Sequence, residues 1–343
     1  MSAVVALPYT RGEAKEWAQA TWHGCCNVVM PTFTRDCRRL NARAIAHDVQ
    51  RSAQLGFWGT LLVSECGTTL DEYCQLIDIA AGARPRDFHL VVHGSFDALE
   101  DVIAACRYGQ MHGCSAVLLS YPTYFYPTTA REIYDYTRAV AEATDLAVIL
   151  FVVPTWNFAR FHPSQFPLDV LVEMCDLETV VAVKYEAGQP GFSGMVQVHR
   201  LLQGRRVLLS EPMEYNGPAC VELFGMQWMG TSGYEYFADR VPRWFRLLRD
   251  GHFDEGMDLF WTLQPARLAR GQLHASIAGA KLIHRTAWKY MGWLNGMAGG
   301  PLRMPTMRLD DAQMRALRLG LERSGIAPTA DPDAAFFLGR FPE

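Results

Sequence analysis

The sequence has no hydrophobic run long enough to cross a membrane. Its longest apolar stretches, such as 147–154 and 180–183, fall far short of the roughly 20 residues that a transmembrane helix needs. The short apolar segment at the N-terminus has no basic residues before it, so it does not resemble a signal peptide. We therefore expect no membrane segment and a cytoplasmic location.

Clusters of positive charge are also missing. The 343 residues carry a formal net charge of −4, and lysines and arginines gather only in local pairs such as Arg38-Arg39. A nucleic-acid-binding surface needs a basic patch, so no nucleic-acid partner is expected. Half of the residues are hydrophobic and 20% are charged, which excludes a disordered chain. We expect a globular protein that acts on a small molecule.

Sequence signatures of disulfides, metals and nucleotide cofactors are absent as well. The nine cysteines form no C-x-x-C pair, which excludes a zinc ribbon and a disulfide framework. No H-E-x-x-H occurs, and His89 and His93 on one face of an expected strand are better interpreted as half-buried strand residues than as metal ligands. We predict neither a metal nor a cofactor.

Short apolar runs rich in β-branched residues alternate with amphipathic stretches of helical period. The predicted strands are 25–30, 59–64, 89–93, 116–121, 147–153, 180–184, 206–210 and 226–231, and helices between them include 42–55, 70–81, 98–112, 130–143 and 163–174. Eight such units with continuous hydrophobicity predict an α/β fold, a (β/α)8 TIM barrel with parallel strands covered by helices. The alternative, an open doubly wound sheet, is disfavoured because no G-x-G-x-x-G follows the first strand.

After the eighth strand the pattern is helical only, with helices expected at 241–250, 253–264, 275–290 and 310–324 and a turn-rich linker at 295–305. This predicts an N-terminal extension (1–22), a barrel (23–240), a C-terminal helical region (241–326) and a tail (327–343). The tail is ordered only if Phe336, Phe337 and Phe341 dock on the rest of the protein.

Barrel enzymes place their reacting groups at the carboxyl ends of the strands. In the segment VVAVKYEAG, Lys184 follows the apolar run VVAV at the end of a predicted strand, and these apolar neighbours imply burial. Burial lowers the pKa of an amine and makes it a nucleophile toward carbonyl groups. The alternative is a lysine that forms a salt bridge, for which nearby Glu186 is a candidate partner.

Four segments in order carry a resemblance to a known family: AVLLSYPTYFYP, TDLAVILFVVP, VVAVKYEAG and GPLRMPTMRL. From about Gly24 to Ile326 the chain resembles the dihydrodipicolinate synthase / N-acetylneuraminate lyase family, class I aldolases with a (β/α)8 barrel. The resemblance implies that Lys184 forms a Schiff base with a 2-keto acid such as pyruvate. It also implies that Tyr124 is a relay tyrosine that enters the active site of a neighbouring subunit.

Two positions depart from the family pattern. Phe151 occupies the place of the family's catalytic tyrosine, so the hydroxyl that moves protons at the Schiff base is absent. The segment SECGTT replaces the turn that holds the keto-acid carboxylate, and Ser64, Cys66 and Thr68 become candidate substrate-binding residues together with backbone N–H groups. Glu65 at this strand end is a candidate acid/base that replaces the tyrosine.

The aldehyde end of the substrate is expected to be apolar or aromatic. Trp156 stands where relatives that bind dicarboxylic products tend to have arginine, and an indole favours an apolar group. Phe151 and Thr231, at the ends of two other strands, complete the candidate substrate-binding residues. The Lys184-Tyr185 pair and the stretch FARFHPSQFP also resemble the hydratase-aldolase branch that acts on benzylidenepyruvates.

The leading prediction is a Schiff-base lyase that joins or separates a 2-keto acid and an aldehyde. Two alternatives stay open. One is a hydratase, dehydratase or decarboxylase that uses the same imine; the other is an inactive family member that serves as a binding or regulatory protein. A homo-oligomer, either a dimer or a homotetramer, follows from the role that the resemblance implies for Tyr124.

Overall fold

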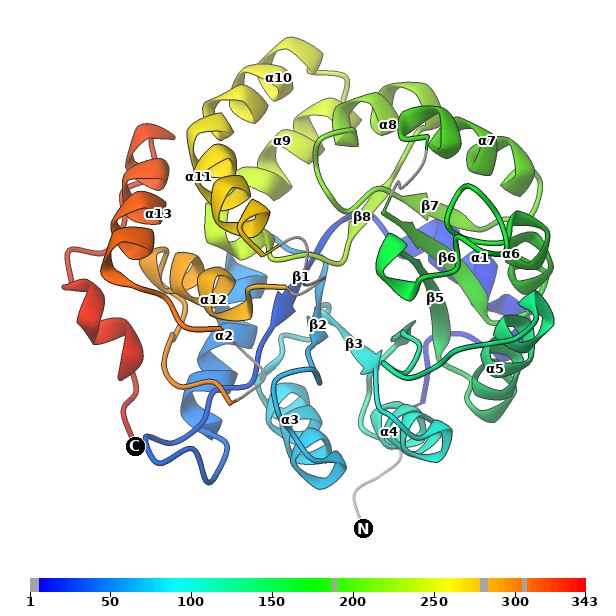
Figure 1. The fold of residues 1–343 in the computed structure, drawn as a ribbon, viewed down its shortest axis with the longest axis horizontal. Helices are drawn as coiled ribbons and strands as arrows, with labels where there is room; N and C mark the ends of the chain where they lie inside the picture. The colour runs from blue at the N-terminus through cyan, green and yellow to red at the C-terminus, as the bar shows by residue number, and fades with distance from the viewer. Residues whose placement is uncertain (1–5, 187–189, 278–282, 304–306) are drawn as a thin grey trace. The chain divides into compact units, whose positions relative to one another are not determined.

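The computed structural model describes residues 6–186, 190–277, 283–303 and 307–343. The chain divides into two compact units. Figure 1 follows its elements from the N-terminus in blue to the C-terminus in red. The first unit contains Met1–Gly24 and His89–Thr231, and the second contains Cys25–Phe88 and Ser232–Glu343.

The first unit is built on a parallel sheet. Its strands are β3 (His89–Gly94), β4 (Ala116–Leu119), β5 (Ala147–Val152), β6 (Val180–Tyr185), β7 (Leu208–Ser210) and β8 (Trp228–Gly230). From β3 to β7 each strand pairs in parallel with the next one in the chain. Nearly every residue of these strands is buried, as continuous rather than alternating hydrophobicity predicts.

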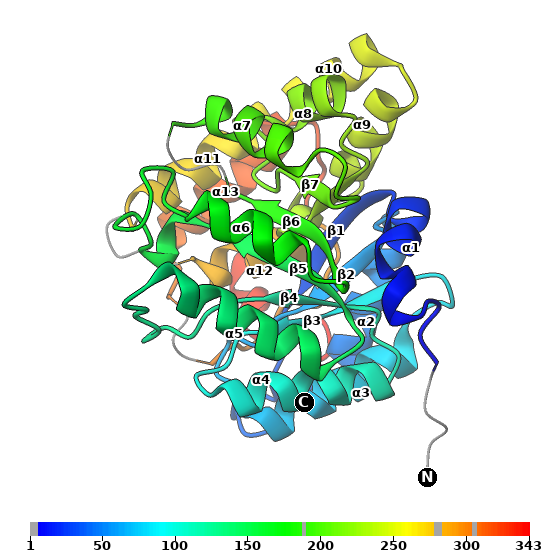
Figure 2. The ribbon, with the colours of Figure 1, turned by 90° about the vertical axis from the view of Figure 1, so that its right-hand side faces the viewer.

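Helices connect these strands in the order that parallel pairing requires. They are α4 (Leu99–Met111), α5 (Ala130–Ala143), α6 (Leu168–Cys175), α7 (Phe192–Leu202) and α8 (Gly217–Phe224), and α1 (Ala14–Thr21) precedes the sheet in the sequence. Figure 2 shows α4 to α7 side by side along one face of strands β3 to β6. A capping box of Thr129 and Glu132 begins α5.

The second unit holds the first two strands and the C-terminal helices. Strands β1 (Gly24–Val29) and β2 (Gly59–Leu62) are parallel, with Cys26 opposite Gly59. Helix α2 (Ala42–Gln54) connects them, and α3 (Leu70–Ala83) packs beside it. The remaining elements are η3 (Tyr234–Phe237), α9 (Arg240–Arg249), α10 (Phe253–Thr262), α11 (Gln264–Ala275), α12 (Arg285–Leu294) and α13 (Asp311–Arg323).

Along the described chain, eight strands alternate with helices, and each predicted strand is present within three residues of its predicted ends. This alternation is that of a (β/α)8 barrel, followed by helices only. The strand predicted from residue 206 begins at Leu208 because Arg206 has a left-handed backbone, with φ of 55°.

Two helix predictions were wrong in their extent, and one helix was not predicted. The helix expected at 163–174 begins at Leu168, because Pro167 is its N-cap residue. The helix predicted at 253–264 is present and ends at Thr262, and Pro265 lies in the first turn of a separate helix, α11, which the periodicity did not predict.

A single helix over 275–290 was also wrong. Helix α11 ends at Ala275, and α12 begins at Arg285 after His284, whose Nδ1 accepts a hydrogen bond of 3.1 Å from the Ala287 N–H. Residues 278–282 of the predicted helix lie outside the described residues, as do 304–305 of the predicted linker and 304–306 of the GPLRMPTMRL segment.

The C-terminal tail docks on the second unit through two of its three phenylalanines. Phe336 is 1% exposed and packs against the rings of Tyr290 and Trp293. The Phe341 ring lies 4.8 Å from the guanidinium carbon of Arg43, whereas Phe337 is 48% exposed. The condition for an ordered tail is therefore met by Phe336 and Phe341.

Candidate active site

Lys184 is buried at the carboxyl end of β6, and only 6% of the residue is exposed. Four apolar residues, Val-Val-Ala-Val, precede it in the strand and bury the backbone on both faces. In register it lies opposite Phe151 of β5 and Ser210 of β7. The parallel sheet thus presents the amine at the strand end where barrel enzymes carry their chemistry.

The amine of Lys184 has an aromatic ring and a carboxylate as neighbours. Nζ lies 3.8 Å from the centroid of the Phe151 ring and 3.2 Å from Oε1 of Glu186. Residues 184 and 186 are two apart, and such residues of an extended chain lie on the same side. Both the ring face and the carboxylate stabilise a positive charge on the nitrogen.

Aromatic side chains continue from Phe151 along the end of β5. The indole of Trp156 meets the Phe151 ring edge-on at 5.5 Å, and its Nε1–H donates to the Phe151 carbonyl oxygen at 2.8 Å. Tyr121, after β4, meets Trp156 edge-on at 5.7 Å. Phe151 and Trp156 are only half-buried, so part of each ring is accessible. The predicted pair Phe151 and Trp156 is therefore close to Lys184, on one aromatic wall.

A second carboxyl group near this site was not singled out from the sequence. Glu211 directly follows Ser210 at the end of β7 and is 1% exposed. Burial, with a smaller contribution from the negative charges of Glu186 and Glu214, raises the pKa of Glu211 to about 8, although the N–H groups of Met213 and Asn216 donate to it and lower it. One of its oxygens, Oε2, has no hydrogen-bond partner among the described residues.

A carboxyl group with a pKa near neutrality can both donate and accept a proton. The sequence signal for Glu211 was its place at a strand end, where it follows a serine as one of several strand-end residues. Only the fold shows that it is buried beside other carboxylates, since burial of a loop residue has no local signature.

Hydroxyl groups at the ends of β7 and β8 have different roles. Ser210 Oγ accepts from the Gly230 N–H at 3.0 Å and donates to the Gly230 carbonyl at 3.1 Å, which ties the two strands together. Thr231, a predicted substrate-binding residue, is 3% exposed, and its Oγ1 has no partner within the described ranges.

The phenols of the first unit differ in availability. The Tyr121 hydroxyl is paired with Thr137 Oγ1 at 2.9 Å, and burial raises the pKa of Tyr121. Burial also raises the pKa of Tyr185. Tyr124, the predicted relay residue, is 92% exposed in the segment between β4 and α5. Of these three phenols, Tyr124 is thus the one that a neighbouring chain could reach; Tyr126, in the same segment, is also exposed.

The turn that carries the other predicted residues belongs to the second unit. Thr68 Oγ1 donates to the Ser64 carbonyl at 2.8 Å, and the Cys66 N–H donates to the same oxygen at 2.9 Å. Cys66 is fully buried, and burial raises the pKa of its thiol to about 11, so it stays protonated. Ser64, Cys66 and Thr68 therefore lie together in one tight turn.

Glu65, the predicted acid/base, projects from the same turn. Its Oε2 accepts a hydrogen bond of 2.6 Å from Nη2 of Arg285, at the start of α12. Its side chain is 38% exposed. The arginine orients the carboxylate and is a partner that the sequence did not suggest.

His89 and His93 each pair with a serine. His89 Nδ1 lies 3.1 Å from Ser115 Oγ, and His93 Nε2 lies 3.2 Å from Ser120 Oγ. Among the residues that the structure describes, no three His, Cys, Asp or Glu side chains are grouped to hold a metal ion. In the same part of the chain, no helix has the length and hydrophobicity to span a membrane.

Comparisons with known proteins agree with these observations. The profile of the Dihydrodipicolinate synthetase family matches residues 65–321. The 4-hydroxy-tetrahydrodipicolinate synthase of Methanothrix thermoacetophila is 24% identical over 300 residues, 83% of this chain and 91% of that protein. The N-acetylneuraminate lyase of Rhizobium meliloti is 25% identical over 309 residues, 86% of this chain and 93% of the relative.

Solved structures confirm the fold. PhdJ bound to a substrate intermediate matches with a TM-score of 0.73 at 17% identity, covering 92% of this chain and 97% of PhdJ. N-acetylneuraminate lyase from Fusobacterium nucleatum matches with a TM-score of 0.71 at 17% identity, covering 88% and 99%. The predicted TIM barrel with C-terminal helices is therefore confirmed.

Proposed function

Because this chain belongs to the dihydrodipicolinate synthetase family, we propose that it is a Schiff-base lyase whose Lys184 condenses with a 2-keto acid such as pyruvate. The observation that carries the proposal is the buried amine at the end of β6, held between the Phe151 ring and the Glu186 carboxylate. Family members of known activity include lyases, and this lysine is the group of the described site that can attack a carbonyl.

The first step needs an uncharged amine. Glu186, 3.2 Å from Nζ, accepts a proton from the ammonium group, and the amine then adds to the keto carbon. Loss of water from this adduct leaves an iminium ion on Lys184. The ring of Phe151 and the carboxylate stabilise this cation as they stabilise the ammonium.

The iminium ion then serves as the electron sink for carbon–carbon bond cleavage. A base takes the proton from the hydroxyl group of the substrate, the carbon–carbon bond breaks, and the electron pair moves to the imine as an enamine while the aldehyde leaves. Protonation of the enamine carbon and addition of water release the keto acid and restore Lys184. The reverse sequence joins the two products.

The aldehyde is proposed to carry an apolar or aromatic end. The support is the half-buried wall formed by Phe151 and Trp156, backed by Tyr121. An aromatic group bound there gains edge-to-face contacts and loses contact with water. The hydratase-aldolase branch that the sequence resembles uses a version of this chemistry in which water is added before the carbon–carbon bond is cleaved.

The proton carrier that replaces the missing tyrosine is proposed to be a carboxyl group. The sequence favours Glu65, and the structure adds Glu186, next to Lys184, and Glu211, whose pKa is about 8. Tyr124 of a neighbouring subunit is proposed as the further relay, which requires a dimer or a tetramer built from dimers. Ser64 and Thr68 are proposed to hold the keto-acid carboxylate.

Borohydride trapping tests the proposal. Incubation with pyruvate and borohydride should reduce the iminium ion to a stable secondary amine, which peptide mass analysis locates on Lys184. The sequence has three other lysines, Lys15, Lys281 and Lys289, which serve as internal controls. Lys184→Ala should abolish the adduct.

A panel of 2-keto acids extends this test to the substrate class. No adduct with any keto acid, or an adduct at another lysine, would contradict the lyase and favour a binding protein. If the adduct forms, product analysis with benzaldehyde-type partners separates the lyase, which makes or breaks a carbon–carbon bond, from the hydratase or decarboxylase, which does not.

A further inference from the structure

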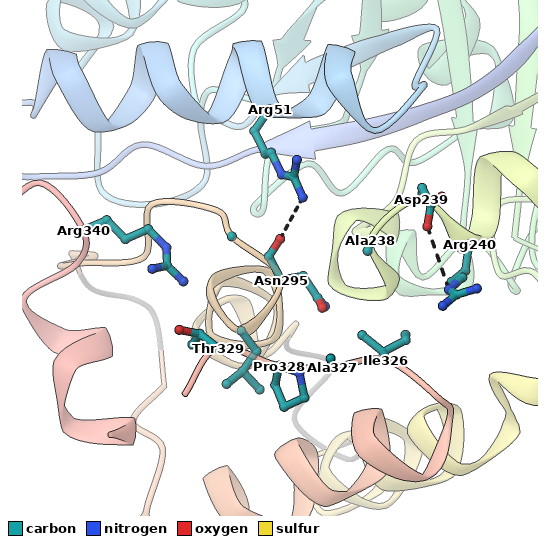
Figure 3. A pocket seen from close by; sticks show the side chains of 12 residues that line it. Arg51, Ala238, Asp239, Arg240, Asn295, Ile326, Ala327, Pro328, Thr329 and Arg340 are labelled. Carbon is teal, nitrogen blue, oxygen red and sulfur yellow. Dashed lines mark hydrogen bonds and ion pairs between the residues drawn. The ribbon is translucent and has the colours of Figure 1, made fainter. Parts of the chain in front are cut away.

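A hollow of about 530 Å³ lies in the second unit, formed by residues from four separate parts of the chain. Arg51 comes from α2, Arg240 from the first turn of α9, Asn295 from the segment after α12, and Thr329 and Arg340 from the tail. Figure 3 shows the three guanidinium groups on three sides of the hollow, with Asn295 between them. None of these residues belongs to the proposed active site.

The charges around the hollow are unbalanced. Three arginines face one carboxylate, that of Asp239, whose Oδ1 lies 3.8 Å from Nε of Arg240. The other oxygen of Asp239, Oδ2, lies 3.7 Å from Nη1 of Arg243, one turn further along α9. The side chains that line the hollow therefore carry a net positive charge, although Arg340 also pairs with Asp331, which is not a lining residue, and such a lining attracts an anion.

The arginines also retain hydrogen-bond donors. Arg51 donates from Nη2 to the Asn295 carbonyl at 3.4 Å. Arg240 donates from Nη2 to the Gly325 carbonyl at 3.3 Å. A guanidinium group has five N–H donors, so both groups have donors left for a ligand.

Arg340 is positioned by the protein itself. It donates to the carbonyl groups of Met297 and Trp293 at 3.1 and 2.9 Å, and to Asp331 Oδ2 at 3.2 Å. Such contacts hold the guanidinium group in place before any ligand arrives, which lowers the entropy cost of binding. Because Arg340 belongs to the docked tail, a ligand here would connect the tail to α2 and α9.

We propose that this hollow is a binding site for a small organic polyanion, a molecule with at least two phosphate or carboxylate charges held by Arg51, Arg240 and Arg340. Planar guanidinium groups bind both kinds of oxyanion through paired hydrogen bonds. The volume lies within the range of roughly 300 to 1,000 Å³ that is usual for small-molecule sites. It exceeds the size of a single inorganic anion.

Calorimetric titration of the full chain with pyrophosphate and with citrate tests the proposal and separates the two chemistries. At least one of the two should bind with one-site stoichiometry, and sodium chloride at equal ionic strength should not reproduce the heat or the accompanying rise in melting temperature. The anion that binds more tightly identifies whether phosphate or carboxylate is the preferred group.

Variants locate the site. Arg51→Gln and Arg240→Gln should each weaken binding of the tighter anion roughly tenfold, the effect of losing one charge-assisted contact. Arg246→Gln on the exposed side of α9 is the matched control and should bind normally. Asp239→Asn removes the one carboxylate of the hollow and should strengthen binding, which damage to the fold would not do.

Three results would overturn the proposal: no binding of either anion, binding that both arginine variants retain, or stabilisation that chloride reproduces. Lys184→Ala must bind as the unchanged protein does. If that variant abolishes binding, the anion occupies the proposed active site and not this hollow. The result of keto-acid trapping has no bearing on this outcome, so the two proposals stand or fall separately.

Discussion

Nζ of Lys184 lies 3.8 Å from the centre of the Phe151 ring, and the two residues are in register on neighbouring strands. A phenyl ring stabilises a cation but has no proton to give. The proton transfers that a Schiff base requires must therefore use other groups. The carboxylate of Glu186, 3.2 Å from the same nitrogen, is a group in direct contact that can accept a proton.

The role of Glu186 can be tested by Glu186→Gln, which keeps the size of the side chain. We expect kcat to fall by about 10² to 10⁴, since this is the usual contribution of a positioned acid or base, while KM for the keto acid changes less. Single-turnover borohydride trapping should show slower adduct formation on Lys184. Glu142→Gln, on the exposed surface of α5, is the control; equal kcat in both variants would contradict the role.

Phe151→Tyr distinguishes a lost tyrosine from a replaced one. If a carboxyl group has taken over, the added hydroxyl would be unpaired against an apolar surface and cost about 1 to 3 kcal/mol. We therefore expect Phe151→Tyr to be less active with the native substrate, and Glu65→Gln to be less active still. A faster Phe151→Tyr enzyme would favour simple loss of the tyrosine, and unchanged kcat in Glu65→Gln would exclude Glu65 as its replacement. Arg285→Gln removes the ion pair with Glu65 but keeps the Glu65 carboxyl group, so its kcat shows what the ion pair alone contributes.

Glu211 should make stability depend on pH. Burial raises its pKa to about 8 in the folded protein, above the ordinary value of 4.5, so the native state retains a proton that the unfolded state releases. Its stabilisation is complete below about pH 4.5 and is lost as the pH rises through 8. Glu211→Gln should flatten this part of the profile and raise stability at pH 8 by about 1 to 3 kcal/mol. Denaturant unfolding between pH 5 and 9 measures the free energy of unfolding of both proteins. If its slope against pH is the same in Glu211→Gln as in the unchanged protein, the carboxyl group does not titrate in this range.

Tyr124 should act only within an assembly. Its ring is 92% exposed in the single chain, so a catalytic role requires a neighbouring subunit. Light scattering should give a dimer or a tetramer, and Tyr124→Phe should lower kcat while adduct formation on Lys184 persists. Tyr126→Phe, at a nearby exposed position, is the control. An active monomer would remove Tyr124 from the mechanism.

The tail should contribute to stability through Phe336. Phe336→Ala deletes a ring that is 1% exposed between Tyr290 and Trp293, and we expect a loss of about 3 to 5 kcal/mol in the free energy of unfolding. Phe337→Ala makes the same change at a position 48% exposed and should cost far less. Similar losses in the two variants would contradict docking of the tail through Phe336.

The sequence alone determined the order and nature of the barrel elements and the candidate nucleophile. Continuous apolar runs produce buried parallel strands, and Lys184 in VVAVKYEAG is recognisable because four apolar residues directly precede it. Boundaries failed where a single residue intervened, as Pro265 and His284 did in the C-terminal helices. A local cap or proline outweighs a periodic pattern.

Tertiary structure decided what surrounds these residues. The Phe151 ring reaches Lys184 only because parallel pairing puts residues 33 positions apart in register, and the pKa of Glu211 is raised only because packing buries its carboxyl group. Arg51, Arg240 and Arg340 are far apart in the sequence and line one hollow only in the folded chain, where the tail contributes Arg340. Such relationships depend on the register of strands and the docking of distant segments, for which no local pattern of residues exists.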